Sequence, residues 1–223
     1  MSNIKALVLG LLLLVPIFVF IFITTFGEHY FSLRTYFPEL DDKGEVVYNT
    51  KGDTVFSKIP DFTLTSQEGR TFKKSEDLKE TIYVVDFFYA TCPVICKKMS
   101  SQMTRVQEAY RNNPSIKLVS ITVNPENDTA AVLKNYADQY DAIPGKWFFL
   151  TGSREQIYKL ASESFYLPVQ QVPGQQDFIH SEKFMLVDKE QRVRGIYDGT
   201  EYKDVDRLIL EINVLLDEYS KNK

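Results

Sequence analysis

Two cysteines are the residues of this chain best suited to chemistry. Cys92 and Cys96 are the only cysteines among the 223 residues, and two placed at random would fall this close with odds of about one in a hundred. They follow a β-branched and aromatic run, residues 82–89, which is typical of a strand buried on both faces. Cys92 is expected in the loop that leaves this strand, and Cys96 in the first turn of the next helix. Both sulfurs can therefore lie at a helix N-terminus.

The chemistry that suits such a cysteine pair is the binding of Cu(I). Unpaired amide groups at a helix N-terminus stabilise anions and lower the pKa of thiols, so that two thiolates are plausible at neutral pH. Thiolates are soft donors that favour Cu(I). Two thiolates and one Cu(I) carry one net negative charge, which the helix end offsets in part. The pair therefore predicts a copper site.

A neutral imidazole is the natural third ligand for such a copper ion. The chain has only two histidines, His29 and His180. His29 adjoins an apolar N-terminal segment, where it is expected to anchor the chain at a membrane interface. His180 precedes a strand predicted at residues 184–187, and in a thioredoxin-like sheet that loop approaches the helix end. We therefore expect His180 to bind the metal, with a surface or core histidine as the plain alternative.

Other functions of the cysteine pair stay open. A structural disulfide is weakly favoured, because a four-residue ring constrains little chain entropy. A redox-active disulfide between Cys92 and Cys96 would fit a thiol:disulfide oxidoreductase, although such enzymes usually carry Cys-x-x-Cys. A peroxidase-like activity would rest on the fold alone. Met99 and Met103 stand at helical spacing and are better explained as core residues than as thioether ligands.

Strands and helices alternate along the rest of the chain. The hydrophobic pattern predicts a hairpin at 59–64 and 71–72, strands at 82–89, 116–123, 146–150, 184–187 and 195–197, and helices at 94–111, 131–140, 151–162 and 203–219, with a further short strand at 46–48. This order is typical of an α/β thioredoxin-like fold, a central mixed sheet flanked by helices. The cysteines then lie near the carboxyl ends of parallel strands, where open α/β sheets place their sites.

The N-terminal segment is predicted to cross a membrane. Residues 6–26 contain no charged side chain, and 18 or more such residues are enough for a spanning helix. No small-residue cleavage site ends the run and no cysteine follows it, which disfavours signal cleavage and lipid modification. We therefore expect a transmembrane anchor at 1–26, a tether at 27–56 and the thioredoxin-like domain at 57–223.

Charge indicates where this domain would work. Lys5 precedes the apolar run, and positive flanks stay in the cytoplasm. We therefore expect a single-pass protein of the cell inner membrane with its domain on the periplasmic side, where disulfides form. The net charge of -4 and the pI near 5.4 exclude nucleic acid as an expected partner.

Four stretches of the chain resemble the SCO/SenC family of copper-binding proteins. They are Asp86-Phe87-Phe88-Tyr89-Ala90-Thr91-Cys92-Pro93-Val94-Ile95-Cys96, then residues 120–129 (SITVNPENDT), 150–153 (LTGS) and His180-Ser181. The resemblance extends over roughly residues 55–217 and agrees in order and spacing. It implies a thioredoxin fold and one copper ion, Cu(I) or Cu(II), bound by Cys92, Cys96 and His180.

The resemblance also implies a function and partners. Family members help to assemble the binuclear CuA centre of cytochrome c oxidase, so the expected partners are the CuA-bearing subunit and a chaperone that donates the copper. A metallochaperone is expected rather than an enzyme. Val94, Lys97 and Ile179 depart from the family pattern, which often has Asp, Pro and Asp at these positions. Fewer carboxylates beside the metal would change its affinity.

Overall fold

The computed structural model describes residues 3–26, 32–170, 178–179 and 181–221. The chain divides into two compact units, residues 1–32 and 33–223. Helix α1 (Asn3–Phe26) covers the segment predicted as an anchor. No helix among the described residues reaches the combined length and hydropathy that crossing a membrane requires. The transmembrane part of the prediction is therefore not confirmed.

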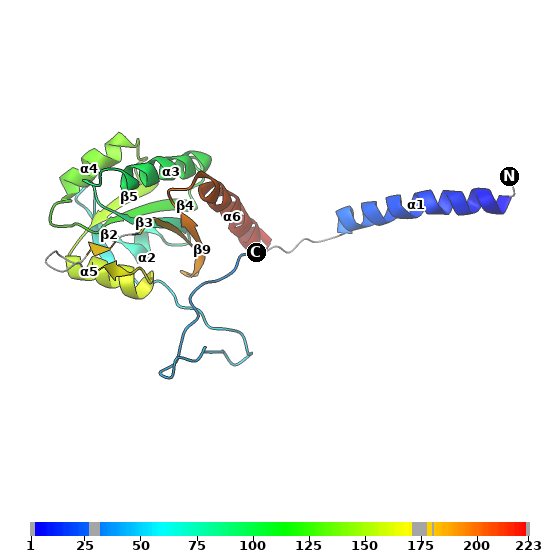
Figure 1. Ribbon diagram of the computed structural model, residues 1–223, viewed down its shortest axis with the longest axis horizontal. Helices are drawn as coiled ribbons and strands as arrows, with labels where there is room; N and C mark the ends of the chain where they lie inside the picture. Colours follow the sequence, from blue (N-terminus) through cyan, green and yellow to red (C-terminus); the bar gives the residue numbers. More distant parts are fainter. Residues whose placement is uncertain (1–2, 27–31, 171–177, 180, 222–223) are drawn as a thin grey trace. The chain divides into compact units, whose positions relative to one another are not determined.

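The second unit is built on a mixed sheet of seven strands in the order β2-β1-β5-β4-β3-β8-β9 (Figure 1). The strands are β1 (Thr63–Ser66), β2 (Thr71–Lys73), β3 (Ile82–Phe88), β4 (Ile116–Thr122), β5 (Trp147–Thr151), β8 (Lys183–Val187) and β9 (Val193–Asp198). Strands β3, β4 and β5 are parallel and central, and the others add antiparallel pairs at both sides. A separate pair joins β6 (Val169–Gln170) to β7 (Phe178–Ile179).

Helices cover both faces of this sheet, as Figure 1 shows. One face carries α3 (Ile95–Ala109), α4 (Ala130–Gln139) and α6 (Tyr202–Lys221), whose apolar residues share one core cluster. The other face carries α5 (Arg154–Lys159) and the π-helical turn η1 (Leu160–Ser164), whose apolar residues belong to a second cluster. Leu78, which directly follows the short helix α2 (Lys74–Asp77), lies in the same cluster. The predicted α/β fold, a mixed sheet between two layers of helices, is confirmed.

Strand β3 joins the two cores because it is buried on both faces. All seven of its residues are buried. Side chains of a strand alternate between faces, so Val84 and Phe88 pack beneath α3 while Val85 and Phe87 pack on the side of α5. A continuous apolar run is the sequence that this position requires. The strand therefore ends at a fixed point beside α3.

Two local predictions differ from the structure, and three short elements were not predicted. The strand expected at 46–48 is replaced by single bridges that join three segments, 38–40, 46–48 and 54–56, and the turns between these segments contain Gly44 and Gly52 at positive φ. The helix expected at 151–162 begins only at Arg154, because Ser153 caps it by accepting a hydrogen bond from the amide of Gln156. Helix α2 and the pair β6-β7 were not predicted, since four and two residues are too short for a periodic pattern.

Candidate metal centre

Cys92 lies in the loop that connects β3 to α3, and Cys96 lies in the first turn of α3. The amide of Cys92 donates to the carbonyl of Tyr89 over 3.2 Å, which closes a turn directly after the strand. Helix α3 begins at Ile95, and the amide of Cys96 donates to Cys92 Sγ over 3.2 Å. Both cysteines are buried and carry free thiols. The two sulfurs thus share one helix N-terminus.

The two thiols differ in acidity. Burial raises the pKa of Cys92, but hydrogen bonds from the Cys96 thiol and from the amides of Cys96 and Val94 outweigh it and hold that pKa below the usual cysteine value. The pKa of Cys96 is raised well above that value by burial, by its hydrogen bond to Cys92 and by repulsion from charge there. Cys92 is therefore the more acidic thiol, and the helix end does not lower the pKa of both cysteines as expected.

Tyr89 is a third member of this group that the sequence pattern did not single out. Its hydroxyl hydrogen-bonds Cys92 and helps to lower the pKa of that thiol. Burial, together with the neighbouring charge on Cys92, raises the pKa of Tyr89 to about 12. The hydroxyl therefore keeps its proton and acts at neutral pH as a donor toward the Cys92 sulfur.

A small cavity of about 10 Å³ adjoins Cys96. It is lined by Phe87, Phe88, Tyr89, Ile95, Cys96, Val123 and Ser181. Ser181 comes from the segment before β8, and the antiparallel pairing of β8 with β3, with Met185 opposite Val85, directs that segment toward the end of β3. The register of two distant strands thus brings residue 181 to the cysteines.

Neither histidine lies within the described residues. His180, the predicted third ligand, and His29 both fall outside them. Within the described ranges, no group of three or more His, Cys, Asp or Glu side chains is arranged to hold a metal ion. The ligand set of Cys92, Cys96 and His180 therefore stays a prediction, with two of its three members placed.

None of the three residues that depart from the family pattern, Val94, Lys97 and Ile179, is a carboxylate. Val94 precedes α3 and is 67% exposed. Lys97 is exposed in the first turn of the helix, which contains no acidic residue. Ile179 lies in β7. A cation in the first helical turn opposes the helix dipole, so the fold itself does not favour Lys97 there.

Asp86 is a buried carboxyl beneath the cysteine loop. It lies in β3 opposite Ser120 of β4. Ser120 Oγ donates to Asp86 Oδ1 over 2.6 Å, and Trp147 Nε1 donates to Ser120 Oγ over 2.9 Å. Burial raises the pKa of Asp86 to about 7, against the lowering effect of the Ser120 hydrogen bond. The only signal in the sequence was an acidic residue within an otherwise apolar run.

This raised pKa predicts a pH-dependent stability. The folded protein holds the Asp86 proton more tightly than the unfolded chain, whose carboxyl titrates near 4. The stability gained from this group is complete below about pH 4 and is lost as the pH rises through about 7. Asp86→Asn keeps an acceptor for Ser120 and removes the charge. The quantity to measure by urea unfolding is the free energy of unfolding of the metal-free variant minus that of the parent. We expect this difference to be roughly 2–4 kcal/mol more favourable to the variant at pH 8 than at pH 4.5.

A matched control for this variant is available on the surface. Asp138 pairs with Lys134 in α4, and its side chain is exposed. Asp138→Asn should therefore change stability by the same small amount at both pH values. An Asp86→Asn protein whose offset from the parent is equal at pH 4.5 and pH 8 would contradict the assigned pKa.

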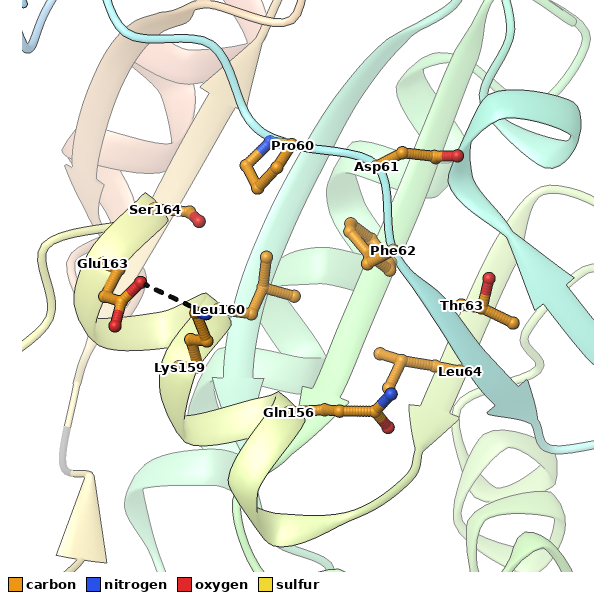
Figure 2. Close-up of a pocket in the computed structure, with 10 residues that line it drawn as sticks. All are labelled: Pro60, Asp61, Phe62, Thr63, Leu64, Gln156, Lys159, Leu160, Glu163 and Ser164. Atoms are coloured by element: carbon orange, nitrogen blue, oxygen red, sulfur yellow. Dashed lines mark ion pairs between the residues drawn. The ribbon is translucent and has the colours of Figure 1, made fainter.

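A larger hollow lies away from the cysteines, between residues 60–64, which lead into β1, and the helical turns of α5 and η1 (Figure 2). Its volume is about 460 Å³. The residues that line it are Pro60, Asp61, Phe62, Thr63, Leu64, Gln156, Lys159, Leu160, Glu163 and Ser164. Figure 2 shows the single ion pair among them, Lys159 with Glu163 at 4.0 Å. Size alone does not make this hollow a candidate Cu(I) site, because its lining has no thiol or imidazole.

Comparison with known proteins extends these observations. The family model described as SCO1/SenC matches residues 51–217. A SCO1 protein homolog of Bacillus subtilis is 32% identical over 162 residues, which cover 72% of this chain and 83% of that protein. The solved structure of BsSco, described as a member of the Sco family of cytochrome c oxidase assembly proteins with a disulfide switch, is 32% identical with a TM-score of 0.61 and covers 70% of this chain and 91% of that one.

A copper-bound structure shares the fold at lower identity. ScoI of Bradyrhizobium japonicum, solved with copper bound, is 23% identical with a TM-score of 0.59, over 71% of this chain and 99% of that one. At this identity the likeness extends to the arrangement of strands and helices. It agrees with the mixed sheet and the helix layers described above.

Proposed function

The chain belongs to the SCO1/SenC family, and we propose that it is a membrane-anchored copper metallochaperone. It binds one copper ion through Cys92, Cys96 and His180. It serves the assembly of the CuA centre of cytochrome c oxidase. This is supported by its relative BsSco, which is described as a member of the Sco family of cytochrome c oxidase assembly proteins. The expected partners are the CuA-bearing subunit, which receives the copper, and a chaperone that donates it.

The observation that carries this proposal is the hydrogen bond from the Cys96 amide to Cys92 Sγ, 3.2 Å long, between two free thiols at one helix end. Two sulfur donors suit Cu(I), which prefers soft ligands. Cys92 is the more acidic thiol and is ready to bind. Cys96 must release its proton when the copper arrives, because metal ligands bind deprotonated. Copper is here the cargo of the protein.

His180 is proposed as the third ligand because of its neighbour in the chain. Ser181 lines the same cavity as Cys96, and consecutive Cα atoms lie only about 3.8 Å apart. A neutral imidazole donor completes a low-coordinate copper site that two sulfurs leave open. The membrane anchor is proposed from the sequence, since residues 6–26 carry no charge.

Anaerobic titration of the reduced protein with Cu(I) tests the metal assignment. We expect saturation at one equivalent per chain, with X-ray absorption showing two sulfur neighbours and one nitrogen neighbour. Saturation above one equivalent, or a metal without nitrogen neighbours, would contradict the proposed site. Inorganic copper is the probe, so the outcome does not depend on the client protein.

The variant His180→Ala separates the metal site from thiol chemistry. We expect its affinity for Cu(I) to fall at least about tenfold, which corresponds to about 1.4 kcal/mol, because the copper loses its nitrogen donor. Its rate of thiol-disulfide exchange should stay near that of the parent. Competition with a Cu(I) chelator measures the first quantity, and reduction of a small disulfide measures the second. An unchanged affinity would remove His180 from the site.

A second function is favoured by the unequal acidity of the two thiols. A lowered pKa at Cys92 and a raised pKa at Cys96 suit a thiol:disulfide oxidoreductase that keeps oxidase cysteines reduced. The Cys92 thiolate would attack a client disulfide, and Cys96 would then displace the client from the mixed disulfide. The client gains two electrons and the Cys92–Cys96 pair loses them. Reduction that survives His180→Ala and stops in Cys92→Ser, in a protein that does not bind copper, would select this function.

A further inference from the structure

Asp128 lies next to the cysteine loop although it is 36 residues away in sequence from Cys92. It belongs to the turn between β4 and α4, where its amide donates to the carbonyl of Asn124 over 2.9 Å. Its side chain is fully buried. Asp128 Oδ2 accepts a hydrogen bond from the amide of Ala90 over 3.0 Å and a second one from Thr122 Oγ1. One carboxylate oxygen thus ties the end of β4 to the loop that carries Cys92.

The other oxygen of this carboxylate is unusual. Asp128 Oδ1 is buried and has no hydrogen-bond partner among the described residues. Burying an unsatisfied carboxylate oxygen costs free energy, since the water that solvated it is not replaced. An amide or a hydroxyl could hold Ala90 and Thr122 at a lower cost. Stability of the turn is therefore a weak explanation for an acidic residue here.

The contact with Ala90 matters because of where that residue lies. Ala90 is the second residue after β3 and the second before Cys92. Its amide is held by Asp128, and the next hydrogen bond of the loop is that of the Cys92 amide with Tyr89. Together they define the path from the buried strand to the sulfur. At the end of this path, the amide of Cys96 donates a hydrogen bond to Cys92 Sγ over 3.2 Å.

We propose that Asp128 is a positioning residue for the sulfur pair: its carboxylate fixes the Ala90 amide and thereby sets Cys92 Sγ against the N-terminus of α3. Asp128 does not touch the metal and acts through the loop. A charged acceptor forms a stronger hydrogen bond than a neutral one, which gives the acidic residue a use that the stability of the turn does not require. The inference rests on the proposed function only for its copper readout.

The experiment compares three variants of the full chain. Asp128→Ala removes the acceptor of the Ala90 amide. Asp128→Asn keeps an oxygen for Ala90 and is the conservative rescue. Thr122→Val removes the other hydrogen bond to the same oxygen, together with the one that Thr122 Oγ1 accepts from the Asn124 amide. It is equally buried and leaves the Ala90 amide its acceptor on Asp128. Urea unfolding establishes that each variant is folded, and Asp128→Ser replaces Asp128→Ala if the latter does not fold.

Thiol chemistry provides the readouts that a purely structural role would not move. In Asp128→Ala we expect two quantities to change at least fivefold. The first is the equilibrium constant between the Cys92–Cys96 dithiol and its disulfide, measured against glutathione, and the second is the alkylation rate of Cys92. Asp128→Asn should recover only part of each shift, because its neutral oxygen is a weaker acceptor for the Ala90 amide, and Thr122→Val should stay within about twofold of the parent. Equal shifts in Asp128→Ala and Thr122→Val, or no shift in either, would overturn the proposal.

The copper readout keeps this inference distinct from the function itself. If the parent binds one Cu(I), the affinity of Asp128→Ala should fall by about 10–100-fold, the usual effect of losing an outer hydrogen-bond partner. An unchanged affinity together with unchanged thiol chemistry overturns the positioning role and leaves the copper function intact. If the parent binds no copper, the proposed function fails, and the thiol readouts still decide the role of Asp128.

Discussion

Replacing Cys96 by serine is expected to lower the affinity for Cu(I) by well over 100-fold, more than the ~10–100-fold that follows from losing an outer hydrogen-bond partner of a ligand. A serine hydroxyl stays protonated at neutral pH and is a hard donor, so the copper would lose one of its two soft ligands. Cys92→Ser should have an effect of the same size. Competition with a Cu(I) chelator under anaerobic conditions measures both.

Single variants of the two cysteines should still differ in their remaining thiol. In Cys92→Ser the repulsion that helps to raise the pKa of Cys96 is removed, so that thiol becomes more acidic than in the parent. In Cys96→Ala, which unlike serine offers no donor, the remaining Cys92 loses the hydrogen bond from the Cys96 thiol and becomes less acidic. Alkylation rates measured against pH report both shifts.

A matched control for the cysteine variants lies in the same loop. Thr91 is exposed and adjoins Cys92, so Thr91→Ser changes the loop without changing a sulfur. Its affinity for Cu(I) should equal that of the parent. A Cys96→Ser protein that binds Cu(I) within tenfold of the parent would mean that the metal, if bound at all, lies elsewhere.

The cysteine loop could be predicted from sequence because its determinants are local. A continuous apolar run places β3 in the middle of the sheet, and apolar residues at three- and four-residue spacing place α3 directly after it. The strand and the helix that flank Cys92 and Cys96 both lie within residues 82–109. Local patterns likewise predict the alternation of strands and helices from which the fold class followed.

The carboxyls around the site could not be predicted, since their surroundings are made by distant strands. Asp86 is buried against Ser120 because β3 pairs with β4 in one particular register. Asp128 meets Ala90 only after the turn beyond β4 folds back over the end of β3. A single sequence shows an acidic residue in each case, but not the distant partner that decides its role.

The largest effect on stability is expected at Arg194 in β9. Its guanidinium is buried and bonds to Asp188 over 3.1 Å, to Glu218 of α6 over 2.9 Å and to the carbonyl of Leu33 over 2.7 Å. Arg194→Met would leave these carboxylates and the carbonyl without their shared donor. Removing one partner of a buried ion pair costs about 3–5 kcal/mol, which for a domain of this size lowers Tm by roughly 6–20 °C. Urea and thermal unfolding measure both.

The control for this variant is an arginine that also pairs with two carboxylates but is more exposed to solvent. Arg207 pairs with Asp204 and Glu211 on α6, but its side chain is 43% exposed, so Arg207→Met should cost no more than about 1 kcal/mol. Equal losses in the two variants would contradict a special role of burial. The difference between the two losses matters because residues 33–36 lie along β9, the strand at the edge of the sheet. There the amide of Tyr36 donates to the carbonyl of Val193, so that this segment covers the edge. If Arg194→Met alone is costly, one buried guanidinium holds the beginning of the domain to its last strand and last helix.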